Sequence, residues 1–161
     1  MDRGVRLGVD VGTVRIGVAA SDPDGLMAFP VTTVQRGKGD TAVADAVAQL
    51  AEIVAERGAT QVFVGLPRKL SGAQGTSAED ARLIAGALSE RCEAVVRLVD
   101  ERFSTTTASA SMRQAGRNAK QQRQVIDQAA AVVILESALD IERRGNLSKV
   151  TEMIPREGGN D

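Results

Sequence analysis

Hydrophobic periodicity changes near residue 40, and this change restricts the possible folds strongly. Before it, β-rich runs at 5–11, 14–21 and 29–34 follow one another with only turns between them, which indicates hairpin-linked antiparallel strands. After it, apolar residues at helical spacing alternate with short apolar runs. A chain in this order is expected to form an α/β fold, a mixed sheet with helices on its faces.

The second part of the chain predicts two further strands and four helices. The expected strands cover 61–65 and 95–99, and the expected helices cover about 41–57, 77–91, 105–115 and 120–143. The helix-linked strands should be parallel, with right-handed crossovers. We therefore predict one five-stranded domain over 1–145, followed by a polar, flexible tail over 146–161.

The residue types missing from the chain exclude several classes of chemistry. Among 161 residues there is no histidine, tryptophan or tyrosine, and one cysteine, Cys92. Without histidine there is no Ser-His-Asp or Cys-His pair and no histidine metal ligand. One cysteine excludes an internal disulfide and a multi-cysteine zinc site. Catalysis is left to carboxylates, Lys/Arg, hydroxyls, backbone groups, or a metal held by oxygen.

The sequence is typical of a cytoplasmic protein. Its N-terminus has no apolar segment of the signal-peptide type, and its longest strongly apolar run, 129–135, is too short to span a membrane. The lone Cys92 fits a reducing compartment. The formal charge of −1 does not by itself point to nucleic acid. We expect a cytoplasmic location and no membrane partner.

Acidic residues occupy three places where an acid is unexpected. Asp10 interrupts an apolar strand just before a glycine turn, where a buried carboxylate is costly unless it is satisfied. Asp100 and Glu101 end the last predicted strand, where ligands gather in open α/β sheets. Successive side chains of a strand point to opposite faces, so only one of the two acids would lie on the side of Asp10, and the sequence does not say which. Asp127 shares an apolar helical stripe that should face the sheet.

Each of these acids also has a plainer structural explanation. Asp10 could accept backbone N–H bonds in the turn that follows it, and Asp100 could cap the next helix. Asp127 could pair with Arg123, four residues earlier on its helix. An exposed pair of that kind contributes little and leaves the apolar stripe unexplained.

Convergence of three carboxylates would give them a chemical use. Like charges a few ångströms apart repel by roughly 1–4 kcal/mol, and a divalent cation removes that cost. Oxygen ligands without histidine or cysteine favour magnesium or manganese over zinc. Two such ions about 4 Å apart would suit in-line displacement at phosphorus.

A stretch without acids suggests a substrate. Residues 102–126 hold five cations and no acidic residue: Arg102, Arg113, Arg117, Lys120 and Arg123. Arg68 and Arg36 stand in other predicted loops. A basic face beside an acidic metal site would suit a phosphodiester polymer, although a solvated cationic helix face is the alternative.

Four segments together resemble the YqgF/RuvX family, whose members are described as pre-16S rRNA nucleases or Holliday-junction-resolvase-like proteins. They are LGVDVGTVRIGVAASD (7–22), VGLPRKLSGAQG (64–75), DERFSTTTA (100–108) and K-x6-D-x-AA (120–130). The resemblance implies an RNase H-like fold with a five-stranded mixed sheet, in agreement with the predicted order of strands and helices.

The resemblance also implies site residues. Its acidic positions fall on Asp10, the Asp100–Glu101 pair and Asp127, and we expect Glu101 to be the functional member of the pair, with Asp100 in reserve. These acids would bind magnesium or manganese and carry catalysis. The implied substrate contacts, with Arg68 added from its predicted loop, are Arg15, Arg68, Arg102, Thr106 and Lys120.

We expect the protein to be a metal-dependent endonuclease that acts on structured nucleic acid. The first expected activity is processing of the 5′ end of pre-16S rRNA. A Holliday junction resolvase acting on branched DNA is one alternative, and it would need a homodimer. A non-catalytic nucleic-acid-binding or transcription factor on the same fold is another. The segment DVGTVRIGVA also resembles the phosphate loop of sugar kinases and actin-like ATPases, but those proteins need two such domains.

Overall fold

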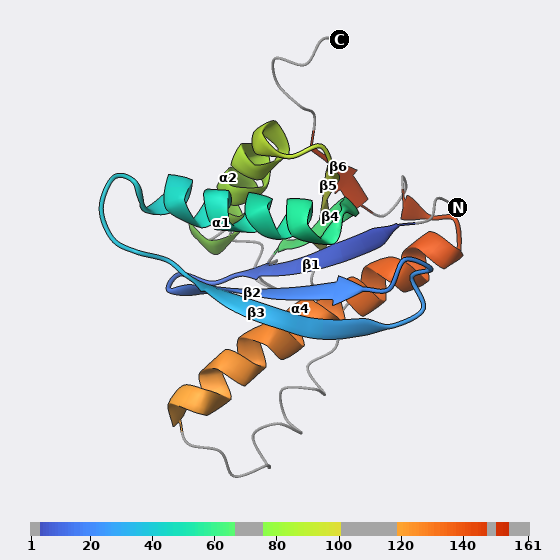
Figure 1. The fold of residues 1–161 in the computed structure, drawn as a ribbon, viewed down its shortest axis with the longest axis horizontal. Helices are drawn as coiled ribbons and strands as arrows, with labels where there is room; N and C mark the ends of the chain where they lie inside the picture. Colours follow the sequence, from blue (N-terminus) through green and yellow to red (C-terminus); the bar gives the residue numbers. More distant parts are fainter. Residues whose placement is uncertain (1–3, 67–75, 101–118, 148–150, 155–161) are drawn as a thin grey trace.

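A mixed β-sheet with helices on both faces forms the centre of the protein (Figure 1). The computed structural model describes residues 4–66, 76–100, 119–147 and 151–154, with only the backbone described at 76–77 and 119–127. The strand order across the sheet is β3-β2-β1-β4-β5-β6. In chain order, the elements are β1 (Val5–Val11), β2 (Arg15–Ser21), β3 (Ala28–Gln35), α1 (Ala42–Arg57), β4 (Ala59–Leu66), α2 (Thr76–Arg91), β5 (Val95–Asp100), α4 (Ala119–Arg143) and β6 (Thr151–Met153).

The strand directions confirm the predicted mixed sheet. Strands β1, β2 and β3 are antiparallel neighbours, whereas β4 and β5 run parallel to β1. The chain passes through α1 before β4 and through α2 before β5. The carboxyl ends of β1, β4 and β5 therefore meet at one edge of the sheet, which is where ligands bind in open α/β folds.

Two cores lie on opposite faces of the sheet. Under α1 and α2, the first core takes alternate residues of the strands, including Leu7, Val9, Val11, Val96 and Leu98. Under α4, the second core joins strand residues Ala19, Phe63 and Val99 to helix residues Ala131, Ile134, Leu135, Ala138 and Leu139. The stripe predicted to face the sheet on this helix, at 131, 134 and 138, is therefore confirmed.

Helix α4 approaches β1 closely at Gly8. A Cβ atom at this position would lie 2.6 Å from the Ala131 carbonyl oxygen and 2.7 Å from the Cβ of Leu135. Only glycine leaves room for the helix backbone at that distance. Gly8 therefore sets how near α4 lies to the strand that carries Asp10.

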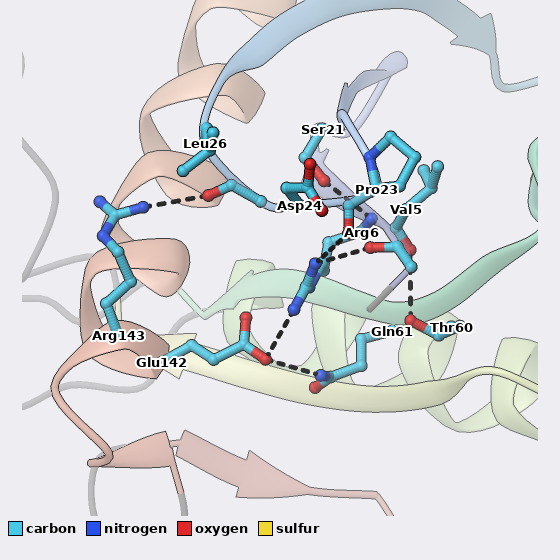
Figure 2. Close-up of polar contacts among 12 residues, drawn as sticks. Val5, Arg6, Ser21, Pro23, Asp24, Leu26, Thr60, Gln61, Glu142 and Arg143 are labelled. Carbon is cyan, nitrogen blue, oxygen red and sulfur yellow. Dashed lines mark hydrogen bonds and ion pairs between the residues drawn. The ribbon is translucent and has the colours of Figure 1, made fainter. Parts of the chain in front are cut away.

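A buried ion pair holds the C-terminal end of α4 to the start of β1 (Figure 2). Arg6 is fully buried, and its Nη2 lies 3.0 Å from Oε2 of Glu142. Its Nη1 donates to the carbonyls of Gly4 at 2.7 Å and Pro23 at 3.1 Å. Gln61 of β4 also donates to Oε2 of Glu142, at 3.3 Å. The network joins four segments of the chain: the start of β1, the turn after β2, the start of β4 and the end of α4.

The structure adds a sixth strand to the five that were predicted. Residues of β6, within the predicted tail, pair antiparallel with β5, and Ile154 continues the contact by donating its N–H to the Val96 carbonyl at 2.9 Å. The division of the chain at residue 145 stays a prediction, and the sheet extends past it. The helix predicted at 105–115 lies outside the described residues. Within the described ranges, no helix is both long and apolar enough to cross a membrane.

Candidate active site

Asp10 and Asp100 are the two predicted acids whose side chains the structure describes. Asp10 is half-buried, one residue before the end of β1, and it pairs with Gly17 of β2. On its other side Val9 pairs with Val64, so the next residue of β4, Gly65, comes beside Asp10. Glycines thus flank Asp10 on both neighbouring strands, and no side chain of those two positions covers its carboxylate.

The two cores identify the face on which Asp10 lies. Leu7, Val9 and Val11 pack under α1 and α2, and Gly8 lies against α4. Because side chains alternate along a strand, Asp10 shares the face of Gly8. The candidate site is therefore at the carboxyl end of β1, on the side covered by α4.

The same alternation distinguishes the members of the Asp100–Glu101 pair. Val99 packs in the core under α4, whereas Leu98 packs under α1 and α2. Asp100, buried at 9% exposure, has the parity of Leu98 and so lies on the face opposite Asp10. If β5 continued extended by one residue, Glu101 would come onto the face of Asp10. Glu101 itself lies outside the described residues, so its choice over Asp100 stays a prediction.

The course of α4 brings position 127 toward this end of the sheet. Glu142 lies beside Arg6 and Ala131 lies at Gly8, so the helix read backwards runs toward the end of β1. Position 127 is one turn before Ala131 in the chain, and so one turn nearer to that end of the sheet. The side chain of Asp127 is outside the described part of the chain, so its meeting with Asp10 stays a prediction.

Among the predicted substrate contacts, Arg15 is placed on the same face and at the same edge as Asp10. It begins β2 with the parity of Gly17, and its carbonyl accepts the Gly12 N–H at 2.9 Å across the β1–β2 turn. Lys120 falls in the first turn of α4, with its side chain outside the description. Arg68, Arg102 and Thr106 lie outside the described residues.

Arg36 was grouped with the basic residues that could meet substrate, and the structure gives it a structural partner. It forms a salt bridge with Asp80 of α2, in which Nη2 donates to Oδ1 at 3.0 Å and Nη1 donates to Oδ2. Its Nη1 also donates to the Gly12 carbonyl at 2.8 Å. The hydrogen bond with Asp80 raises the pKa of Arg36. The two residues are 44 positions apart, so no local pattern reveals the pair.

An open hollow of about 410 Å³ lies next to this salt bridge, lined by Thr13, Arg36, Glu79, Asp80 and Leu83. It borders the turn that follows β1 and the first turns of α2. Its described lining residues include none of the predicted catalytic acids.

The donor chemistry around Asp10 fits a hard divalent cation. Asp10 contributes carboxylate oxygens there, and the chain has no histidine. Cys92 lies just before β5 begins, at the other end of the sheet from the carboxyl ends of the strands. In the part of the chain that the structure describes, no three Asp, Glu, His or Cys side chains gather. Two of the three predicted carboxylates fall outside that part.

Comparison with known proteins gives consistent matches along the chain. The family model "RuvX: Holliday junction resolvase" matches residues 4–141. A protein of Mycobacteroides abscessus named "Putative pre-16S rRNA nuclease" is 54% identical over 143 residues, covering 88% of this chain and 84% of that protein. One of the same name from Leifsonia xyli subsp. xyli is 49% identical over 158 residues, covering 98% and 99%.

Among solved structures, Thermus thermophilus RuvC in complex with a Holliday junction substrate is similar in fold. Its TM-score is 0.62 at 15% identity, and the match covers 94% of this chain and 99% of that one. At this level of identity the likeness shows the fold, which is RNase H-like.

Proposed function

The chain belongs to the RuvX family, and on this premise we propose that it is a nuclease that hydrolyses phosphodiester bonds of structured nucleic acid and processes the 5′ end of pre-16S rRNA. The two relatives named "Putative pre-16S rRNA nuclease" are about 50% identical to this chain over most of its length. The structural observation that supports the proposal is the place of Asp10, between two glycines at the carboxyl end of β1, on the face toward α4.

We propose Asp10, Glu101 and Asp127 as the catalytic acids and as ligands of magnesium or manganese. When bound, such an ion would neutralise charge on the phosphate and lower the pKa of a water molecule. The role of the chain is to hold three carboxylates on one face from three separate elements. Their mutual repulsion, which is costly without a cation, makes the site receptive to one.

Substrate binding is proposed to use cations at the same edge of the sheet. Arg15 shares the face of Asp10 and would hold a phosphate oxygen by charge-assisted hydrogen bonds. Further contacts along the nucleic acid are proposed for three other cations and one hydroxyl residue: Arg68, Arg102, Lys120 and Thr106. Action on precursor rRNA would place the protein in the cytoplasm.

The test is cleavage of a labelled precursor fragment that spans the 5′ end of 16S rRNA, with magnesium, manganese or EDTA. We expect cleavage with either metal and none with EDTA or in Asp10→Asn, while fluorescence anisotropy shows that this variant still binds RNA. Asp140→Asn is the matched control, because Asp140 is an exposed acid of α4 that pairs with Arg144. Equal cleavage by the wild type and Asp10→Asn would contradict the proposal.

A four-way DNA junction, assayed in parallel, tests the second substrate, which the description of the family model favours. Symmetric cleavage of a junction needs two active sites, so it requires a homodimer detectable by sedimentation. Binding of RNA or junction without cleavage of either would favour a non-catalytic nucleic-acid-binding factor.

A further inference from the structure

A hydrogen bond ties α4 to β3 at the level of the candidate site. Nε2 of Gln128 donates to Oγ1 of Thr33 at 2.9 Å, across 95 residues of sequence. Thr33 pairs with Gly17, and Gly17 pairs with Asp10, so the three residues form one row across the sheet. Gln128 follows Asp127 directly. The bond therefore joins Gln128, the neighbour of Asp127, to the row of the sheet that contains Asp10.

The close contact at Gly8 sets how near α4 lies to the sheet, but apolar packing alone does not fix the tilt of α4 across the sheet. Its buried stripe includes the small residues Ala131 and Ala138, and apolar contact has no direction. The ion pair of Glu142 with Arg6 holds the far end, about 21 Å along the helix from Gln128 at 1.5 Å per residue. A tilt of about 5° around that end would move residue 127 by roughly 2 Å. Magnesium holds its oxygen ligands at about 2.0–2.1 Å, so a shift of that size would weaken binding of the ion.

We propose that Thr33 and Gln128 are positioning residues, whose hydrogen bond fixes the N-terminal half of α4 so that Asp127 and Asp10 can hold the same divalent ion. The inference rests on the proposed function, because it takes those two acids as ligands. Neither Thr33 nor Gln128 needs to touch substrate or ion. Their effect is on the tilt of α4 over the sheet, and through it on the position of residue 127.

The test measures manganese binding to the whole protein by the electron paramagnetic resonance signal of free Mn²⁺. Thr33→Val removes the hydroxyl at nearly constant volume, and we expect Mn²⁺ affinity to fall roughly two- to tenfold, the equivalent of one hydrogen bond. Thr33→Ser keeps the hydroxyl and should restore affinity. Thr32→Val is the matched control, because Thr32 pairs with Val18, which packs in the core under α1 and α2.

A second readout separates positioning from folding. The magnesium concentration for half-maximal cleavage should rise by the same factor in Thr33→Val, with the rate at saturating magnesium and the melting temperature near wild type. Unchanged Mn²⁺ affinity in Thr33→Val, or failure of Thr33→Ser to restore it, would overturn the inference while the ion site stands. Equal Mn²⁺ binding by the wild type and Asp10→Asn would overturn the proposed function, and this inference with it.

Discussion

At Gly8 the space that a side chain would need is already filled by the backbone of α4. Gly8→Ala forces the helix or the strand to shift, and we expect it to lower the free energy of unfolding by about 1–3 kcal/mol, as overpacking of a core does. Urea denaturation measures the change. A variant as stable as the wild type would show that α4 does not press on β1 as closely as described.

Gly86, inside α2, gives the opposite prediction and serves as the control. A Cβ atom there meets nothing within 4 Å. Gly86→Ala should therefore stabilise the protein by about 1 kcal/mol, the difference in helix propensity between the two residues. The same denaturation experiment measures it, and destabilisation at this position would contradict the account.

Asp22 gives a prediction for the dependence of stability on pH. Its carboxylate accepts the backbone N–H groups of Met27 at 2.8 Å and Leu26 at 2.9 Å, and these bonds lower its pKa below the usual 3.8. The stabilisation is therefore complete well above pH 3.8 and is lost as the pH falls through the lowered value. Asp22→Asn should be less stable than the wild type at pH 6, and melting temperatures should converge as the pH falls below 3.

Sequence reasoning at the residue level found Asp10 because an acid inside an apolar strand is locally anomalous. The alternation of side chains along β5 could not distinguish Asp100 from Glu101, because the sequence does not show which helix covers which face of the sheet. The salt bridge of Arg36 was not visible in the sequence for a related reason. Its partner, Asp80, comes from a distant helix, and only the folded chain brings the two together.

At the level of elements, the ion pair between Arg6 and Glu142 anchors α4. The Arg6 side chain is 0% exposed and that of Glu142 is 8% exposed, so removing one partner leaves a buried charge. We expect Arg6→Met to cost about 3–5 kcal/mol of stability. The double variant Arg6→Met/Glu142→Leu should recover a large part of that loss, because no charge remains unpaired. A double variant that loses the sum of the two single changes would contradict this.

Long periodic elements were predicted well, and the shortest one was missed. The stripe of α4 is visible in the sequence because Ala131, Ile134 and Ala138 recur at helical spacing. The sequence does not show which strand α4 crosses, because the close approach at Gly8 is a tertiary contact. Strand β6 has three residues in a polar segment, and its pairing with β5 rather than any local pattern defines it.

For the whole molecule, β6 brings a segment that follows α4 into the sheet. A protein ending at Gly145 would lose the pairing with β5 and the ion pair of Arg82 with Glu152. We expect it to be less stable by roughly 1–3 kcal/mol, from the loss of two or three hydrogen bonds, and to self-associate through the exposed edge of β5. A protein ending at Ile154 keeps β6 and should behave as wild type. Equal stability of the two truncated proteins would contradict a structural role for β6.

The central claim is that distant acids meet over the end of β1 to hold a divalent ion. Crystals soaked in manganese chloride and measured at the manganese absorption edge test it directly. The account predicts an anomalous peak within about 2–2.3 Å of carboxylate oxygens from Asp10, Glu101 and Asp127 together. Manganese peaks only elsewhere, or Asp127 turned to solvent with no ion at Asp10, would contradict it.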